Sequence, residues 1–411
     1  MNILIAPDSF KESLEAIEVC EAIKAGFSNV FPEAAYTLLP LADGGEGTSA
    51  VLSYVLDGQW RQIQVHDPLM RPITSKYFLT ADGIAVIEIA EACGLHLLTK
   101  DERNPLIASS FGVGEMIVDA IDQGATNILI GLGGSATNDA GAGMLQALGV
   151  KLQDAKGTAL KPGGSNLIQL HSIEHQALYN LLSDVTITVA CDVTSPLCGP
   201  TGASHVFGPQ KGATPEQVQS LDNALGIFAQ VTNAHNISKT DCREFEGAGA
   251  AGGLGFGLMA YCNAKLKSGF DTIADIVELD KHLALADVVI TGEGMFDAQT
   301  AMGKVASGVA KRAKQHNVPV IAICGAVDRP HELSAATTTT DDIKSASIDE
   351  SPLLTSLQFE TDLFDIVVPS LQKLDSLEQV FANANRNVAH TAYQIATTLK
   401  LGKNIAAIKS R

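Results

Sequence analysis

The chain has 411 residues, of which 46% are hydrophobic and 18% are charged, and this composition predicts a globular protein of two or three domains. Its formal net charge of −18 argues against a general nucleic-acid binder, because phosphate contacts need clustered Lys and Arg, and against binding to an anionic membrane surface. The seven cysteines are scattered without a C-x-x-C pair, so the sequence indicates neither a zinc site nor a redox dithiol.

Residues 2–6 read as a strand, and the next residues carry the first candidate site residues. Ser9 and Glu12 have the spacing of a capping box, which predicts that a helix begins near Phe10. Asp8 and Lys11 then lie where a strand gives way to a helix, the edge at which open α/β sheets bind ligands. The alternative is that Asp8 only helps the cap and Lys11 is solvated. No signal peptide and no apolar run of 18 residues is visible, so we expect a cytoplasmic protein.

A second strand is predicted at 36–41, and it leads into the glycine-rich segment 42–48, A-D-G-G-E-G-T. Asp43 and Glu46 are three residues apart beside backbone amides, an arrangement that could hold Mg²⁺. Ordinary turn chemistry is the alternative. Short strands at 60–65, 74–79 and 84–89 follow with turns between them, so we expect a hairpin-like extension or a new domain from this point.

The segment Gly131–Met144, G-L-G-G-S-A-T-N-D-A-G-A-G-M, lies between the predicted strand 127–130 and a short helix at 144–150. Such a turn leaves backbone N–H groups unpaired, and glycines let an anion approach the chain. We interpret it as a phosphate or carboxylate cradle with one metal-binding or orienting acid, and the alternative is a tight turn that only permits helix–sheet contact. The candidate residues of this loop are Gly133, Gly134, Ser135, Thr137, Asn138 and Asp139.

Asp192 follows a β-branched strand predicted at 185–190, which again places a carboxylate just beyond a strand end. Thr214 and Pro215 predict a capped helix start. A third glycine-rich loop is predicted at 247–257, where the spacing G-x-G-x-x-G occurs, but no strand precedes it and the dinucleotide interpretation therefore fails.

The strand predicted at 286–290, the helix at 305–315 and the strand at 318–324 form a βαβ unit, and a last helix is predicted at 374–399. The loop of this unit contains two acids, an amide and a lysine, a combination that is rare in a mere linker. These loop residues are Glu293, Asp297, Gln299 and Lys304.

Six motifs occur in an order that resembles the type I glycerate kinase family. They are A-P-D-S-F-K-E-S-L at 6–14, A-D-G-G-E-G-T at 42–48, the loop at 131–144, C-D-V-T-S-P-L-C-G-P-T-G-A at 191–203, G-A-G-A-A-G-G-L-G at 247–255 and T-G-E-G-M-F-D-A-Q-T-A-M-G-K at 291–304. They span about three quarters of the chain. The sequence departs from the pattern of this family in the segment 330–365, which is longer and more acidic than the resemblance leads us to expect.

The resemblance implies an α/β fold of two domains with the active site in a cleft between them. A discontinuous Rossmann-like domain would comprise residues 1–75 and 285–411, and an inserted α/β domain residues 76–284. It also implies a cytoplasmic enzyme that phosphorylates D-glycerate with ATP and Mg²⁺, with 2-phosphoglycerate favoured over 3-phosphoglycerate. The expected partners are these small molecules, with neither nucleic acid nor membrane, and a homodimer is left open.

Phosphoryl transfer needs donors around the phosphates, acids around Mg²⁺ and a base near the attacking hydroxyl, and the candidate residues are assigned to these roles. The proposed catalytic residues are Asp192, Asp43, Asp297, Lys11 and Lys304, with Asp192 as the preferred base. The proposed nucleotide-binding residues are Gly133, Gly134, Ser135, Thr137, Asn138 and Asp8. Glu293, Gln299 and Glu46 are proposed to bind substrate, and Asp43, Asp139 and Asp297 to bind metal.

Two other functions are compatible with parts of the pattern. Gly131, Gly133 and Ala136 match G-x-G-x-x-A, which would suit a nicotinamide-dependent oxidoreductase. A non-catalytic nucleotide-binding module on the same scaffold is the second alternative, although the acids and lysines of all these loops are present.

Overall fold

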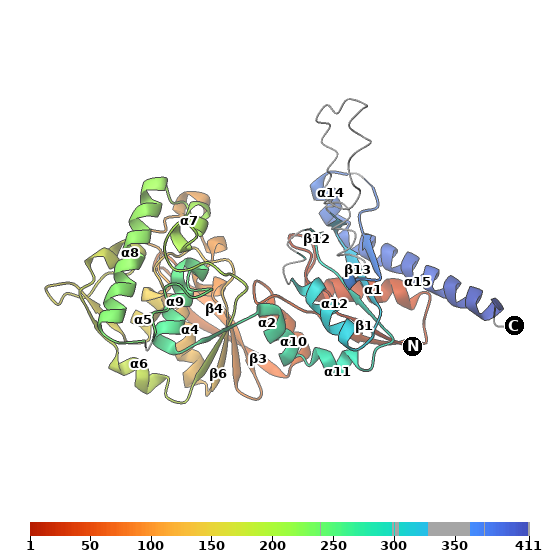
Figure 1. Cartoon of the computed structure of the whole chain (residues 1–411), viewed down its shortest axis with the longest axis horizontal. Helices are drawn as coiled ribbons and strands as arrows, with labels where there is room; N and C mark the ends of the chain where they lie inside the picture. Colours follow the sequence, from red (N-terminus) through yellow and green to blue (C-terminus); the bar gives the residue numbers. More distant parts are fainter. Residues whose placement is uncertain (239, 298–299, 301–303, 328–361, 374, 410–411) are drawn as a thin grey trace, which may run out of the picture. The chain divides into compact units, whose positions relative to one another are not determined.

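The computed structural model describes residues 1–238, 240–297, 300, 304–327, 362–373 and 375–409 (Figure 1). Gln299 and residues 330–361 of the acidic segment therefore lie outside the described part of the chain. The predicted α/β class is confirmed, since parallel and mixed sheets alternate with helices. No helix in the described ranges is both long enough and apolar enough to cross a membrane.

The chain divides into two compact units. Unit 1 comprises residues 1–42 and 273–411, and unit 2 comprises residues 43–272. These limits differ from the predicted boundaries at residues 75 and 284. The physical reason is strand pairing, because residue 75 falls inside a strand that belongs to the sheet of unit 2.

Unit 1 contains a five-stranded parallel sheet to which both ends of the chain contribute. Its order is β15-β13-β11-β1-β2, and the strands are β1 (Asn2–Ile5), β2 (Ala35–Leu38), β11 (Val288–Thr291), β13 (Val320–Cys324) and β15 (Ile366–Pro369). β12 (Met295–Phe296) and β14 (Ala326–Val327) form a separate two-stranded parallel sheet. Apolar side chains of β1, β11 and β13 are buried under the helices, as expected for a sheet covered on its faces.

The helices of unit 1 are α1 (Ala16–Ser28), α11 (Leu279–Leu283), α12 (Val305–Gln315), α14 (Leu377–Ala382) and α15 (Ala384–Lys409). Helix α1 packs closely on α15 at Gly26, where a Cβ would lie 2.3 Å from the carbonyl oxygen of Ala389. The single last helix predicted at 374–399 is in fact two, which meet at Asn383.

The helix predicted to begin near Phe10 begins instead at Ala16. Residues 10–14 form a tight turn in which the backbones of Phe10 and Leu14 exchange hydrogen bonds of 2.8 and 2.9 Å. Glu12 has a φ of +65°, which no helix allows, and the capping box is made by Glu15 and Glu18. The prediction from Ser9 and Glu12 was therefore wrong by one and a half turns, because the spacing of a capping box also occurs by chance in a turn.

Unit 2 contains a six-stranded mixed sheet of order β10-β9-β6-β5-β4-β3. The strands are β3 (Gly58–His66), β4 (Pro72–Thr80), β5 (Ile84–Glu88), β6 (Asn127–Gly131), β9 (Thr186–Ala190) and β10 (Lys265–Lys267). β3, β4 and β5 pair antiparallel, which confirms the predicted hairpin, and β5, β6, β9 and β10 run parallel. β7 (Lys151–Gln153) and β8 (Ser172–Glu174) form a separate antiparallel pair.

The helices of unit 2 bury one contiguous apolar core with this sheet. They are α2 (Thr48–Val55), α3 (Ala90–Cys93), α4 (Phe111–Asp122), α5 (Ala142–Ala147), α6 (Gln176–Leu181), α7 (Ala203–Phe207), α8 (Pro215–Ala234) and α9 (Ala250–Cys262), while α10 (Gly269–Ile276) crosses the division between the units. The capped start predicted at Thr214 and Pro215 is confirmed, since Thr214 caps α8.

The third glycine-rich segment is a buried helix rather than a loop. α9 covers most of it and has a kink at Ala251, Gly252 and Gly253, whose φ angles are +52°, +70° and +87°. At the kink, a Cβ on Gly252 would lie only 2.0 Å from the carbonyl oxygen of Thr137. The glycines therefore permit close approach to the central glycine-rich loop, which is a packing role.

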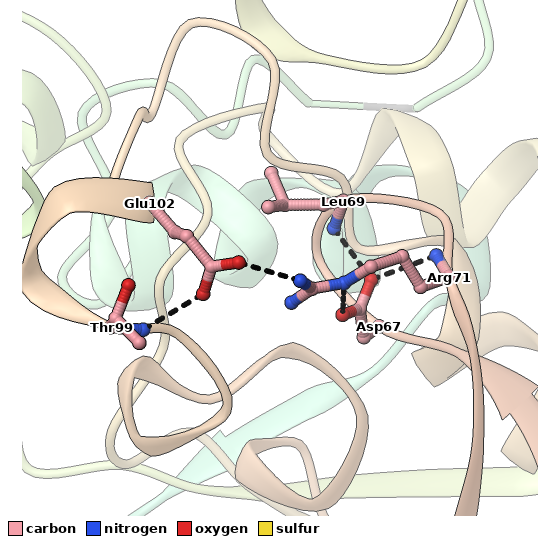
Figure 2. Close-up of polar contacts among 5 residues, drawn as sticks. All are labelled: Asp67, Leu69, Arg71, Thr99 and Glu102. Carbon is pink, nitrogen blue, oxygen red and sulfur yellow. Dashed lines mark hydrogen bonds and ion pairs between the residues drawn. The ribbon is translucent and has the colours of Figure 1, made fainter.

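A buried carboxylate organises the turn that joins β3 to β4 (Figure 2). Asp67, which is 1% exposed, accepts hydrogen bonds from the amides of Leu69 and Arg71 and from the Arg71 guanidinium. The Arg71 guanidinium also donates a hydrogen bond to the carboxylate of Glu102, which accepts a second one from the amide of Thr99. This network fixes the turn, and the Pro68 carbonyl in it accepts from the amide of Ser109, two residues before α4.

Candidate active site

The loop that begins with Asp43 packs against the carboxyl ends of β6 and β9. A Cβ on Gly131, the last residue of β6, would lie 2.4 Å from the carbonyl oxygen of Gly44. A Cβ on Gly44, whose φ is +81°, would lie 2.5 Å from the Cβ of Ala190, the last residue of β9. Three motifs that are distant in the sequence, at 42–48, 131–144 and 191–203, therefore meet at one edge of the sheet of unit 2.

Asp192 and Asp43 lie next to each other at this edge. The Oδ1 of Asp192 accepts a hydrogen bond of 2.9 Å from the amide of Gly269. A Cβ on Gly269 would lie 1.8 Å from the carbonyl oxygen of Asp43 and 3.1 Å from the Oδ2 of Asp192. Partial desolvation, reinforced by the negative charge of Asp43, raises the pKa of Asp192 above its usual value, although the Gly269 amide opposes the shift.

The remaining acid of the 42–48 loop, Glu46, is exposed at the surface, and the sequence did not indicate what holds this loop. Glu88, at the end of β5, holds the loop in place. Its carboxylate accepts hydrogen bonds from the amides of Gly47 at 3.2 Å and Ser49 at 2.7 Å. Glu88 thereby provides an acceptor for backbone amides at the start of α2 that have no partner within the helix. Burial raises the pKa of Glu88, and the two amides counteract the shift.

The central loop exposes backbone donors at its tip. The amide groups of Gly133, Gly134 and Ser135 make no hydrogen bond to any residue in the described part of the chain. Gly134 is exposed and has a φ of +70°, while Gly133 is half-buried. Successive N–H groups around a left-handed residue form a concave donor surface that suits an anion.

The deeper residues of the loop are buried and hold its shape. Asp139 accepts from the amide and hydroxyl of Ser110, each at 2.9 Å, and from the amides of Gly141 and Gly143. Its pKa is raised by complete burial against the effect of these donors. Asn138 donates to the hydroxyl of Ser204 at 2.9 Å. With its oxygens already engaged and the side chain fully buried, Asp139 acts in this structure as an organiser of the loop, and we leave it out of the proposed metal site.

Lys211 was not among the residues predicted from the sequence motifs. It ends a short 3₁₀ helix, η4 (Pro209–Lys211), is 2% exposed, and donates to Ser135 Oγ at 2.9 Å and to the Thr137 carbonyl at 2.6 Å. Desolvation lowers its pKa from 10.5 to about 8. A lysine enclosed by Gly208, Pro209 and Gly212 in a strongly acidic chain was the available signal, but its burial could not be read from the sequence.

A second group of charged residues lies in unit 1. Lys304 is 3.9 Å from Glu293 Oε2 and 3.9 Å from Asp297 Oδ1. Glu293 is 4% exposed, and its Oε1 has no hydrogen-bond partner among the described residues. Burial raises the pKa of Glu293 from 4.5 to about 7, although the Thr300 hydroxyl, Lys304 and Lys11 act in the opposite direction.

The first motif of the chain belongs to the same group. Asp8 donates its amide to the carbonyl of Gly292 at 2.9 Å, and its carboxylate accepts from the amide of Ser9 at 2.7 Å. A Cβ on Gly294 would lie 3.3 Å from the amide nitrogen of Lys11. The predicted residues Asp8, Lys11, Glu293, Asp297 and Lys304 are therefore neighbours in unit 1, while Asp43, Asp192 and the central loop are neighbours in unit 2.

Comparisons with known proteins agree with these motifs. The model of the glycerate kinase family matches residues 3–349. The chain is 45% identical to glycerate kinase of Bacillus subtilis (strain 168) over 99% of this chain and 100% of that protein. It is 42% identical to glycerate 2-kinase of Escherichia coli (strain K12), over 98% and 99% of the two chains.

The fold is also similar to a solved structure. A crystal structure of a proposed glycerate kinase 2 from Salmonella typhimurium LT2 matches with a TM-score of 0.83 and 43% sequence identity, and covers 98% of this chain and 99% of that one. At this identity and coverage the fold is shared. The chain therefore belongs to the glycerate kinase family, whose members are kinases with an alcohol group of glycerate as acceptor.

Proposed function

We propose that the chain transfers the γ-phosphoryl group of ATP to the 2-hydroxyl of D-glycerate and yields 2-phosphoglycerate. The observation that carries this proposal is the proximity of Asp192 and Asp43 at the strand edge that also bears the amides of Gly133, Gly134 and Ser135, which have no acceptor among the described residues. A base, a second carboxylate and an anion cradle on one edge are the parts that phosphoryl transfer requires. The E. coli relative, named glycerate 2-kinase, favours the 2-position.

Asp192 is our candidate for the general base. Its Oδ1 is fixed by the Gly269 amide, so the carboxylate has a defined direction while Oδ2 accepts no hydrogen bond from that amide. A raised pKa makes a carboxylate a better proton acceptor, because the conjugate acid is more stable. Asp192 would remove the proton of the attacking hydroxyl as the O–P bond forms.

The nucleotide phosphates are assigned to the tip of the central loop. Three backbone donors that have no protein acceptor in the described ranges would bind phosphate oxygens, and glycine at 133 and 134 leaves room for them. We assign Lys11 and Lys304, as in the sequence analysis, to neutralising charge on phosphate oxygens, and Glu293 and Glu46 to binding glycerate.

Mg²⁺ is part of the proposal as the usual partner of ATP. The described residues contain no cluster of three or more His, Cys, Asp or Glu side chains that could bind a metal by themselves. That fits Mg²⁺, which keeps several waters and binds through one or two carboxylates plus substrate phosphates. Asp43 in unit 2 and Asp297 in unit 1 are the candidate protein ligands, each considered within its own unit, and the ion would neutralise charge on the phosphates.

The test is ADP release by the purified protein with ATP, Mg²⁺ and either D- or L-glycerate. We expect ADP only with the D-isomer, and loss of turnover when Mg²⁺ is chelated. Phosphorus NMR identifies the product, since the signal of 2-phosphoglycerate is split by the single proton on C2 and that of 3-phosphoglycerate by the two on C3. A 3-phosphoglycerate product would reject phosphorylation of the 2-hydroxyl but would still identify the chain as a glycerate kinase.

The same assay separates the two other functions. ATP binding without glycerate-dependent ADP release would indicate a non-catalytic nucleotide-binding module. The family match gives no support to the nicotinamide-dependent oxidoreductase, and absence of any NADH binding would dismiss it.

A further inference from the structure

Lys211 places a buried positive charge directly beneath the tip of the central loop. Its ammonium group donates to the hydroxyl oxygen of Ser135 over 2.9 Å and to the carbonyl oxygen of Thr137 over 2.6 Å. Lys211 is 2% exposed and Ser135 is 7% exposed. The lysine therefore does not lie at the surface itself, whereas Ser135 is next to the half-buried Gly133 and the exposed Gly134.

The direction of the first hydrogen bond decides what the serine can do. An ammonium group has only donors, so Ser135 Oγ must accept from Lys211. The hydroxyl proton of Ser135 cannot be directed back at the lysine and remains available for another acceptor. The backbone amide of Ser135 is also without an acceptor among the described residues, so this one residue presents two donors.

The positive charge of Lys211 does more than link η4 to the central loop. A buried ammonium group is disfavoured by desolvation, which here lowers the pKa of Lys211 to about 8. Asp139 and the Cys93 thiol are the ionisable groups close enough to oppose that shift, and the oxygens of Asp139 are already held by Ser110, Gly141 and Gly143. A neutral amide side chain could tie η4 to the loop without this penalty, so the charge itself points to an anionic ligand.

We propose that Lys211 is a positioning residue for the nucleotide phosphates, which it serves through Ser135. It orients the serine hydroxyl so that this group donates to a phosphate oxygen, and it fixes the Thr137 carbonyl away from the anion. The inference rests on the proposed function, since it assumes that the tip of the loop binds the phosphates of ATP or ADP.

The experiment is a double-mutant cycle with Lys211→Met and Ser135→Ala. Methionine keeps most of the volume of lysine without its donors. We expect each single variant to raise the KM for ATP and the Kd for ADP by about 10-fold, since each removes one hydrogen bond to a charged group. The double variant should be no worse than the poorer single variant, because both changes remove the same contact. The KM for D-glycerate should stay within about twofold.

Two controls distinguish positioning from general loosening of the structure. Ser204→Ala removes another fully buried hydroxyl that contacts the same loop, at Asn138, and Lys151→Met removes an exposed lysine paired with Glu174. Both should leave the Kd for ADP unchanged within about twofold. If Lys211→Met does not fold, the comparison of Ser135→Ala with Ser204→Ala decides: an equal loss of ADP affinity in the two overturns the proposal.

The proposed role of Lys211 would also be overturned if the losses of ADP affinity in the two single variants added up in the double variant. Unchanged ADP affinity in both single variants would overturn it as well. The outcome is independent of the proposed acceptor, because calorimetric binding of ADP needs no turnover. A wild-type protein that binds ADP but does not phosphorylate glycerate would reject the proposed function and leave the cycle to decide the role of Lys211.

Discussion

The carboxylate of Asp192 is held by the backbone of Gly269, whose amide donates to Oδ1 over 2.9 Å. These residues are 77 positions apart, and Gly269, the first residue of α10, also lies close to the backbone of Asp43. One glycine therefore sets the relative position of two carboxylates. A Cβ at residue 269 would lie 1.8 Å from the backbone carbonyl oxygen of Asp43 and 3.1 Å from the Oδ2 of Asp192, so the segment of Asp43 would have to move.

Replacing Asp192 by Asn tests its proposed role as the general base. The amide keeps an oxygen that can accept from Gly269, so the variant should fold with an unchanged melting temperature. It cannot take a proton, and we expect kcat for D-glycerate phosphorylation to fall by at least about 100-fold. Asp271→Asn, which removes a neighbouring carboxylate on α10, is the matched control and should keep kcat within about twofold. A kcat near that of the wild type would remove Asp192 from the mechanism.

Gly269→Ala should damage the site through packing alone. The new Cβ would lie 1.8 Å from the carbonyl oxygen of Asp43, so the loop must move. We expect a loss of about 1–3 kcal/mol in the free energy of unfolding and a fall in kcat. Gly226→Ala is the control, since it lies inside α8 with only Cys198 Sγ, at 3.9 Å, near the new methyl group. It should stabilise the protein by up to about 1 kcal/mol. Equal effects of the two substitutions on unfolding would contradict the crowding argument.

Glu293→Gln should change stability in a pH-dependent way. The folded pKa of about 7 lies above the ordinary value of 4.5, so the folded protein holds the proton more tightly than the unfolded chain. The cost of ionising Glu293 therefore appears as pH rises above about 4.5 and is complete above about 7. We expect the variant to be more stable than the wild type by about 1 kcal/mol at pH 5.5 and about 3 kcal/mol at pH 8, measured by urea unfolding.

The exposed Glu21→Gln on α1 provides the reference for Glu293, because its carboxylate is 53% exposed and 3.9 Å from Lys24. It should change the free energy of unfolding by no more than about 0.5 kcal/mol at either pH. A stability difference between Glu293→Gln and the wild type that stays constant across this range would mean that Glu293 does not titrate there.

The Asp67 network in Figure 2 gives a prediction that concerns stability rather than catalysis. Asp67→Ala leaves two backbone amides and the Arg71 guanidinium without their acceptor, and we expect a loss of about 2–3 kcal/mol in the free energy of unfolding. Glu102→Gln, at the more exposed end of the same network, should cost less than about 1 kcal/mol. The KM values of both variants should match the wild type, and an equal loss of stability would contradict the role of burial.

The sequence by itself determined the strands and the chemistry that follows them. Runs of apolar, β-branched residues predicted β6, β9 and β11, and α12 was predicted with its observed bounds, because these patterns depend on neighbours within a few residues. It also predicted that Asp192 and Glu293 lie just beyond strand ends, and these ends belong to two sheets, with β9 in unit 2 and β11 in unit 1. Each acid follows its own strand within a few residues, so local order was enough to place it at a strand end.

Only the tertiary structure decided which of those groups touch and which residues support them. Ser9 and Glu12 have the spacing of a capping box, yet the chain forms a turn there, because the exchange of hydrogen bonds between Phe10 and Leu14 competes with the helix. The glycines at 252 and 253 serve contact with the loop at 137–140 rather than a ligand.

Lys211 is the clearest case of information that the sequence does not contain. Its side chain contacts Ser135, 76 positions earlier, and its meaning depends on being buried. Burial is a property of the whole fold, because it depends on which distant segments exclude water from a group. The order of residues therefore predicted candidate donors and acids, and the fold alone placed a buried lysine in hydrogen-bond contact with one of them, Ser135.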